Sequence, residues 1–146
     1  MQTYLSQHDY LKLQGLLNSK LVEVYYLWWT SEDFKSFDWI ILKFEHSEIC
    51  LSYGSIAENI ILEYNLSEEI KRMEESDVEI MKVEMTYDQK WHNFINKKLL
   101  AFLPTDFSGY CTSSIIFNFE GNCYVEIMAV MDCLEVETTL TKIFKI

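Results

Sequence analysis

Apolar and polar residues alternate in several short stretches that are rich in Val, Ile, Tyr and Trp, a pattern that predicts β-strands. Gly121-Asn122 is typical of a two-residue hairpin turn, because both residues tolerate a positive φ. The predicted strands are Leu21–Trp29, Trp39–Glu45, Glu48–Tyr53 and Ile60–Tyr64 in the first half of the chain. Those of the second half are Leu99–Leu103, Ser114–Glu120, Cys123–Val130 and Leu134–Thr138, with Leu140–Ile146 as a candidate edge strand.

Each group of strands follows a signal for a short helix. Ser6 with Asp9, and Thr86 with Gln89, have the spacing of a capping box, in which a hydroxyl and the later side chain satisfy free backbone N–H groups. Apolar residues recur at helical spacing behind both signals. Between the halves, residues 67–76 are acidic and predict a connecting helix that begins at Ser67.

The two halves also share short sequence matches in the same order, which predicts a duplication. The offsets between matching residues are 78, 73 and 75 positions, a drift that changes in loop length would produce. The matching segments are 17–21 with 95–99, 33–37 with 106–110, and 40–45 with 115–120. We therefore predict one domain over residues 1–146, of the α+β class. It would contain two tandem α-β-β-β-β repeats, at about 6–64 and 86–138, that form one mainly antiparallel sheet or a partly closed barrel with short helices packed on it.

The composition describes a globular chain with an acidic surface. Of the 146 residues, 49% are hydrophobic and 15% aromatic, and the chain has four Gly and one Pro, which excludes disordered and collagen-like classes. The formal net charge is −11, with Arg72 as the single arginine. Nucleic-acid binding and anionic membrane surfaces are disfavoured, because both draw on Lys and Arg. The net charge is explained by solubility alone or by a basic protein partner, whose approach it would steer electrostatically. If the chain has a protein partner, we expect a basic one.

The start of the chain and its cysteines favour a reducing, cytoplasmic location. MQTYLSQHDY lacks the basic and apolar regions of a secretory signal, and no apolar run approaches the length of a membrane span. Cys50, Cys111, Cys123 and Cys133 form no CxxC pair and have no histidine at zinc-ligand spacing. We interpret them as small buried hydrophobes, and expect neither a metal nor a cofactor.

The chain lacks a recognisable catalytic signature. His8, His46 and His92 are scattered, none beside a nucleophile motif, and the four glycines cannot build a phosphate loop. Glu135 and Glu137 share one face of a predicted strand, so a carboxylate-pair hydrolase stays a third hypothesis. A solvated outer face explains this alternation as well. We therefore expect a protein that is not an enzyme.

Aromatic residues supply a second hypothesis. Tyr25, Tyr26, Trp28, Trp29 and Trp39 are close in sequence and could line a pocket for a small molecule between a helix and a curved sheet. Trp28 and Trp29 are consecutive in a strand and must point to opposite faces. The sequence does not decide which of the two is exposed, and it leaves the oligomeric state open.

A short, acidic, Arg-poor chain rich in Ile, Lys and Asn, with strands and aromatics but no catalytic set, resembles the small immunity proteins of bacterial polymorphic-toxin and contact-dependent inhibition systems. The resemblance rests on general character and implies a non-catalytic inhibitor that covers a basic toxin or effector with an acidic surface. From the residues, we expect the partner contacts to lie in the first loop and in the acidic stretch of the second half. The candidate residues are Glu32, Asp33, Asp38, Glu126, Asp132, Glu135 and Glu137.

Overall fold

The computed structural model describes most of the chain, namely residues 5–29, 37–54, 58–64, 68, 71, 80–105, 112–130 and 133–139; the side chains of Trp28 and Trp29 are outside the description. The described part consists of one short helix and nine strands in two antiparallel sheets. The elements are α1 (Gln7–Gln14), β1 (Leu21–Trp29), β2 (Trp39–Phe44), β3 (Glu48–Gly54), β4 (Asn59–Glu63), β5 (Ile80–Glu84), β6 (Leu99–Thr105), β7 (Ser114–Phe119), β8 (Cys123–Val130) and β9 (Cys133–Thr139).

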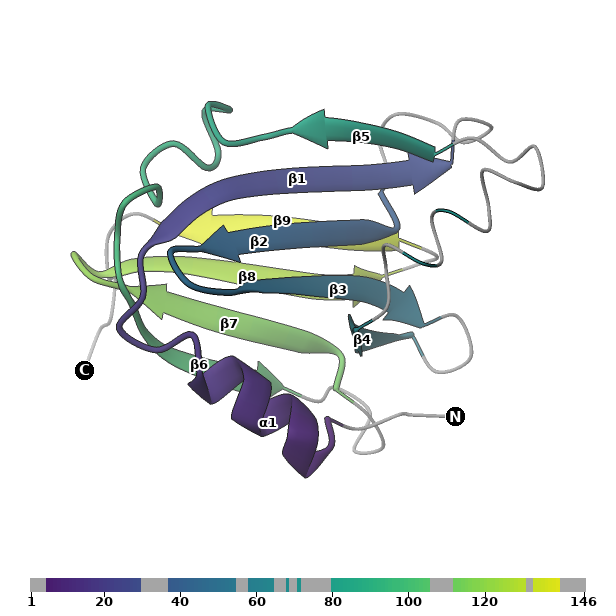
Figure 1. The fold of residues 1–146 in the computed structure, drawn as a ribbon, viewed down its shortest axis with the longest axis horizontal. Coiled ribbons are helices and arrows are strands. Elements are labelled where there is room, and N and C mark those ends of the chain that lie inside the picture. Colours follow the sequence, from purple (N-terminus) through teal and green to yellow (C-terminus); the bar gives the residue numbers. More distant parts are fainter. Residues whose placement is uncertain are drawn as a thin grey trace.

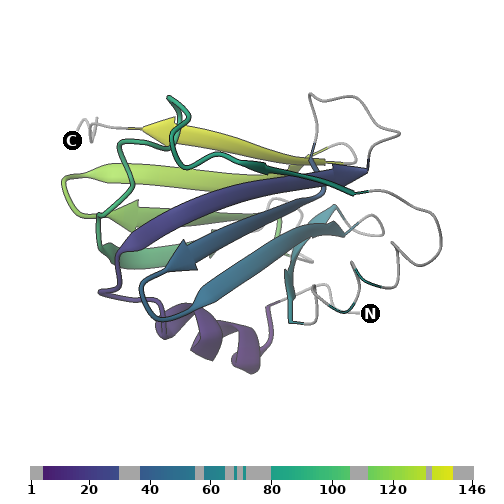
Figure 2. The ribbon, with the colours of Figure 1, turned by 45° about the horizontal axis from the view of Figure 1, so that its top comes forward.

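The two sheets lie face to face, one in front of the other in Figure 1 and seen from a second angle in Figure 2. One has five strands in the order β4-β3-β2-β1-β5, and the other has four in the order β6-β7-β8-β9. The fold is therefore mainly β, where the sequence predicted α+β. It also has two separate sheets, where the sequence predicted one sheet or a partly closed barrel.

All eight strands predicted inside the described residues are present, with bounds shifted by two residues or fewer. The candidate edge strand Leu140–Ile146 lies outside the described residues. Strand β5 was not predicted. It nevertheless alternates with period two: Met81 and Val83 pack against the core, while Lys82 and Glu84 are exposed.

In each sheet, four consecutive strands form an antiparallel meander: β1–β4 in one sheet and β6–β9 in the other. The strands of the two meanders pair in the same relative register. The same irregularity, a β-bulge, interrupts the pairing of β1 with β2 after Leu21 and that of β6 with β7 after Leu99. Bulges bend a strand and increase its twist, so both sheets are shaped alike at this end. The register gives corresponding rows: Ile41–Cys50–Glu63 across β2, β3 and β4, and Ile116–Glu126–Glu137 across β7, β8 and β9.

Reciprocal backbone hydrogen bonds connect the two meanders. The N–H of Asn18 donates to the carbonyl of Leu99 at 2.7 Å, and the N–H of Asn96 donates to the carbonyl of Leu21 at 2.7 Å. Both asparagines are in the left-handed region, with φ of 66° and 68°, which Asn tolerates better than most residues. Each therefore turns the chain into the first strand of its meander.

The predicted first helix is confirmed as α1. Ser6 accepts a hydrogen bond from the N–H of Asp9, and the Asp9 carboxylate accepts one from the N–H of Ser6, which completes the capping box. The helix bridges both sheets, because Lys12 Nζ donates to Ser47 Oγ at 3.1 Å and the ring of Tyr10 lies 6.2 Å from that of Phe102. Leu13, on the inner side of the helix, is fully buried.

The predicted second helix is wrong. Residues 86–96 form consecutive turns instead. The hydroxyl of Thr86 does not cap a helix, since Thr86 Oγ1 accepts a hydrogen bond from the N–H of Val24 in β1. On the other side of the same segment, Lys90 Nζ donates to the Val136 carbonyl in β9 at 2.8 Å, so the turns tie the two sheets together. Of the predicted connecting helix, only Glu68 and Lys71 are described, both helical.

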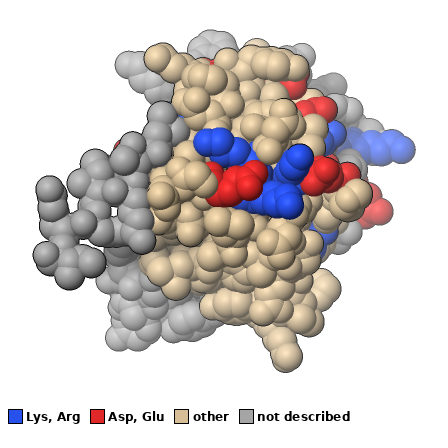
Figure 3. All heavy atoms as spheres, turned by 90° about the vertical axis from the view of Figure 1, so that its left-hand side faces the viewer, with Lys and Arg blue, Asp and Glu red and all other residues tan. Residues whose placement is uncertain are grey.

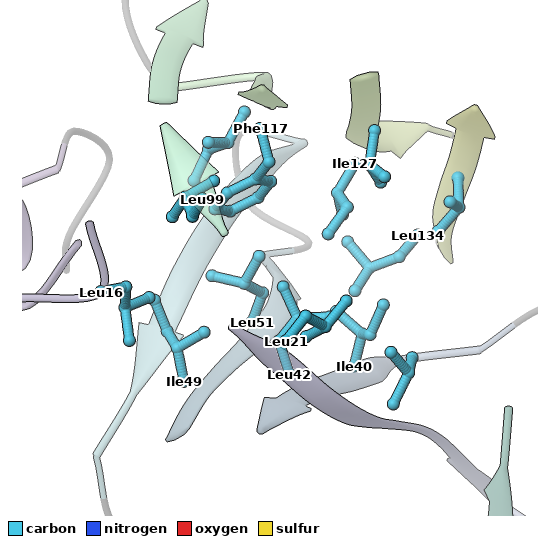
Figure 4. Close-up of a cluster of buried hydrophobic side chains, with 14 of the residues drawn as sticks. Leu16, Leu21, Ile40, Leu42, Ile49, Leu51, Leu99, Phe117, Ile127 and Leu134 are labelled. Atoms are coloured by element: carbon cyan, nitrogen blue, oxygen red, sulfur yellow. The ribbon is translucent and has the colours of Figure 1, made fainter. Parts of the chain in front are cut away.

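One core cluster fills the space between the sheets, and side chains from both sheets point toward one another in Figure 4. Its largest fully buried members are Trp91, Phe94, Phe117 and Phe119, each with an exposed fraction of 1% or less. Burying a side chain of this kind stabilises a fold by roughly 1.5–3 kcal/mol. Packing between the two halves therefore holds the sheets face to face.

Candidate functional site

The outward surface of β6–β9 is the candidate site. In these strands buried residues alternate with more exposed ones, as in β8, where Cys123, Val125, Ile127 and Ala129 are buried. The residues between them point away from the core. We call this surface the acidic face, and it consists of Ala101, Leu103, Thr105, Ser114, Ile116, Asn118, Tyr124, Glu126, Met128, Val130, Cys133, Glu135, Glu137 and Thr139.

Three of the predicted contact residues lie together on the acidic face. Glu126 lies directly opposite Glu137, and Glu135 lies directly opposite Met128. Glu135 and Glu137 are exposed, whereas Glu126 is half-buried. The four strands contain no Lys, Arg or His, so no cation from these strands neutralises the three carboxylates.

A chain of hydroxyl groups holds Glu126 in place. Ser114 Oγ donates to Glu126 Oε2 at 2.9 Å, and Ser114 Oγ is itself hydrogen-bonded to Thr105 Oγ1. These hydrogen bonds connect β6, β7 and β8. Sequence reasoning missed both hydroxyls, because residues 105, 114 and 126 become neighbours only through strand register.

The acidic face becomes apolar toward β6. Ile116 lies opposite Glu126, and Leu103 lies opposite Ile116, so that one row across the sheet is Leu103–Ile116–Glu126–Glu137. Leu103 is 59% exposed. A surface that joins exposed apolar groups to carboxylates suits a partner that is both basic and partly apolar.

The other predicted contacts are not gathered there. Glu32, Asp33 and Asp132 lie outside the described residues. Asp38 lies immediately before β2 of the five-stranded sheet, and one of its carboxylate oxygens is buried. The backbone of its neighbour Phe37 reaches the four-stranded sheet, because the carbonyl of Phe37 accepts a hydrogen bond from the N–H of Leu134 at 2.9 Å.

The outward surface of the five-stranded sheet differs in both polarity and charge. Trp39, Ile41 and Cys50 are each only 7% exposed there, in a second hydrophobic cluster that also contains Leu27. The charges around this cluster are mixed. Lys43 Nζ and Lys82 Nζ lie 5.3 and 4.5 Å from the centre of the Tyr25 ring.

Tyr25 and Cys50, on this second surface, are both harder to ionise than usual. A hydrogen bond from the Tyr25 hydroxyl to Glu23 raises the pKa of Tyr25 to about 12. Burial raises the pKa of the Cys50 thiol, which agrees with its interpretation as a buried hydrophobe. The charged side chains around Tyr25 are of both signs, whereas those on the strands of the acidic face are all acidic.

The end of the molecule where both meanders begin also carries mixed charge. Basic and acidic side chains lie side by side in the middle of the view in Figure 3. Glu45 accepts a hydrogen bond from the N–H of Lys20 at 2.9 Å, and Glu120 accepts one from the N–H of Lys98 at 3.0 Å. These carboxylates have structural partners within the chain.

The predicted aromatic residues lie on opposite sides of the five-stranded sheet. Tyr26 faces the core, stacked on Phe37 with ring centres 3.9 Å apart, and its hydroxyl accepts a hydrogen bond from Trp91 Nε1 at 2.6 Å. Burial raises the pKa of Tyr26 to about 12. Tyr25 and Trp39 lie on the opposite side of the sheet, so these side chains cannot all line one cavity.

The three histidines do not gather with the cysteines that the structure describes. His46 is exposed in the turn between β2 and β3, His8 packs against Tyr64 with ring centres 4.9 Å apart, and His92 is exposed. Among the described residues, no group of three or more His, Cys, Asp or Glu side chains could hold a metal ion. Within the same part of the chain, no helix is long and apolar enough to cross a membrane.

Comparisons with protein-family models, curated proteins and solved structures find no match to this chain.

Proposed function

We propose that this chain is a non-catalytic binding protein of the immunity type, which neutralises a basic toxin or effector by covering it with the acidic face. The observation that carries the proposal is the gathering of Glu126, Glu135 and Glu137 on one surface whose strands contain no base. Such a surface attracts a basic partner over distance and disfavours acidic ones. A cytoplasmic location agrees with the proposal and stays a prediction.

The two meanders further suggest duplication followed by specialisation of one copy. We infer that they are structural repeats, supported by their common register, their equivalent bulges and their reciprocal hydrogen bonds. By that register, Cys50 takes the position of Glu126, Ile61 that of Glu135, and Glu63 that of Glu137. A scaffold that tolerates an apolar residue at the first two positions does not require a carboxylate there for folding. Glu126 and Glu135 are therefore better explained by function, whereas a carboxylate at the position of Glu137 is common to both meanders.

The two alternatives receive less support. A small-molecule pocket was expected from an aromatic set that is divided between the two sides of a sheet. A carboxylate-pair hydrolase would use Glu126 with Glu135 or Glu137, which lie on an outward sheet surface where two of the three are exposed. Glycoside hydrolysis places its carboxylates on either side of the substrate, within a cleft.

A capture experiment tests the proposal. The tagged chain, its E135Q/E137Q variant and an E48Q/E84Q control serve as bait in lysate of the organism that encodes it. Both variants remove two exposed strand carboxylates, but Glu48 and Glu84 lie on the five-stranded sheet. We expect one basic protein to bind the unmodified chain and the control, to be lost from E135Q/E137Q, and to dissociate when salt screens the charges.

The captured protein is then identified by mass spectrometry and expressed alone or together with the chain. An immunity function predicts that the partner alone stops growth, and that the unmodified chain restores it while E135Q/E137Q does not. Equal rescue by both would contradict the acidic face as the binding site. A harmless partner would contradict the inhibitor function.

A further inference from the structure

The edge strands of a sheet can pair with another molecule, because their outer backbone N–H and C=O groups lack a neighbouring strand. The edges of the two sheets are β4, β5, β6 and β9. In β9 the N–H of Leu134 donates to the carbonyl of Phe37 at 2.9 Å. In β4 the N–H of Ile60 donates to the carbonyl of Thr112 at 2.8 Å. Strand β5 carries the exposed side chain of Lys82, and a charge on an edge strand opposes pairing.

Strand β6 differs from these three edges in its side chains. Its residues, Leu99–Thr105, include no charged side chain. Leu100 and Leu103 are 49% and 59% exposed. Exposed apolar edge strands are the ones that pair with other chains. Charge therefore does not protect the β6 edge.

The backbone of β6 directs two residues outward. The carbonyl of Thr105 accepts a hydrogen bond from the N–H of Ser113 at 2.8 Å, so Thr105 directs its backbone groups toward β7. Successive residues of a strand direct these groups to opposite sides, so those of Phe102 and Pro104 point away from β7. Pro104 is the only proline in the chain, and proline has no backbone N–H. The single proline thus removes a donor from the outer edge of β6.

The other meander shows that the equivalent edge holds a strand. By the common register, Tyr26 of β1 takes the position of Pro104 in β6. Tyr26 is paired with Val83 of β5, and the carbonyl of Val24 accepts a hydrogen bond from the N–H of Met85 at 2.7 Å. Strand β5 accordingly lies beside β1 in Figure 1. Among the described residues, no strand occupies the corresponding place beside β6.

We propose that Pro104 prevents a second copy of this chain from pairing with the edge of β6. Two such edges would meet in antiparallel orientation with Leu103 of one copy opposite Leu103 of the other, which pairs each Phe102 with the opposite Pro104. Any other residue at position 104 would let each pair exchange two hydrogen bonds. Proline removes one donor from each pair, and its ring occupies the place of the N–H. This inference does not depend on the proposed function.

Restoring the donor tests the proposal. Sedimentation equilibrium compares the unmodified chain with Pro104→Ala and with Pro104→Thr, a second variant of higher strand propensity. We expect both variants to self-associate at least about tenfold more tightly than the unmodified chain. In the associated form, hydrogen exchange at the N–H of Phe102 should become slower, because this donor would then be bonded to the second copy.

The double variant P104A/L103K is the matched control. It has the same restored donor, but it places two lysines directly opposite each other in the paired edges, where like charges repel. Leu103 is exposed, so the fold should tolerate lysine there, and the lower net negative charge by itself would favour association. We therefore expect the double variant to associate no more than the unmodified chain.

Urea unfolding checks that the variants are folded in these experiments. Association that arises from unfolded chains would persist in the double variant, whereas pairing through β6 would not. Folded Pro104→Ala and Pro104→Thr chains that associate no more than the unmodified chain would overturn the proposal. Equal association of P104A and P104A/L103K would overturn it as well, because the contact would then lie elsewhere.

Discussion

The opposed carboxylates of Glu126 and Glu137 predict that one conservative substitution stabilises the free chain. Glu137→Gln keeps the size of the side chain and removes one of the two charges. Directly opposed like charges on paired strands destabilise by roughly 0.2–1 kcal/mol. Coulomb's law gives a similar figure, because two unit charges about 5 Å apart in water repel by about 0.8 kcal/mol. We expect the free energy of unfolding to rise by about 0.5 kcal/mol.

A matched substitution should have the opposite effect. Glu48 is an exposed strand residue like Glu137, but it lies opposite Lys43, an opposite-charge pair. Glu48→Gln changes the net charge of −11 by the same amount and removes an attraction instead of a repulsion. The free energy of unfolding should therefore fall by about 0.5 kcal/mol, within the range for such pairs. Any general effect of net charge is common to both variants.

Urea denaturation at low salt and at about 1 M NaCl measures both effects, because salt at that concentration shortens the screening length to about 3 Å. The two variants should move the unfolding midpoint in opposite directions at low salt and approach the unmodified chain at high salt. In thermal melts, shifts of about 1–2 °C are expected for a chain of this size. A lower stability of Glu137→Gln, or shifts of the same sign in both variants, would refute the electrostatic explanation.

Three further predictions concern the core, the pH dependence and a turn. Phe117→Ala should lower the free energy of unfolding by about 3–5 kcal/mol, whereas Leu103→Ala on the acidic face should change it by less than about 1 kcal/mol, as urea titrations of both variants would show. Because the pKa of Tyr26 is raised to about 12 in the fold, its contribution to stability is present below about pH 10 and is lost as the pH rises toward about 12. Urea midpoints of Tyr26→Phe should therefore fall less steeply over that range. Asn96→Ala should destabilise by about 1 kcal/mol in thermal melts and Asn96→Gly by less, because φ is 68° at this position.

The strands could be predicted from the sequence because their signal is local. In β8 the alternation of Val125 and Ile127 with Glu126 and Met128 reports directly which residues are buried. The cap of α1 was likewise predicted from Ser6 and Asp9, three residues apart. In such cases the residues that form the contact are close neighbours in the chain.

The errors arose where a distant segment changed the role of a residue. Thr86 has the spacing of a helix cap, but its hydroxyl accepts a hydrogen bond from the N–H of Val24 in β1. Turns form in place of the predicted helix. Strand β5 was missed although Met81-Lys82-Val83-Glu84 alternates; its pairing partner, the edge of β1, is a fact that its own five residues do not contain. Local propensity is a weak guide when tertiary partners compete for the same group.

For the candidate site, the sequence by itself determined the acidic stretch and the alternation that turns Glu135 and Glu137 to one face. Only the tertiary structure decided that Glu126 lies opposite Glu137, that Ser114 holds it, and that Leu103 and Ile116 complete the row. The reason is physical. The direction in which a side chain points follows from the period of its own strand, whereas its neighbours follow from the register between strands.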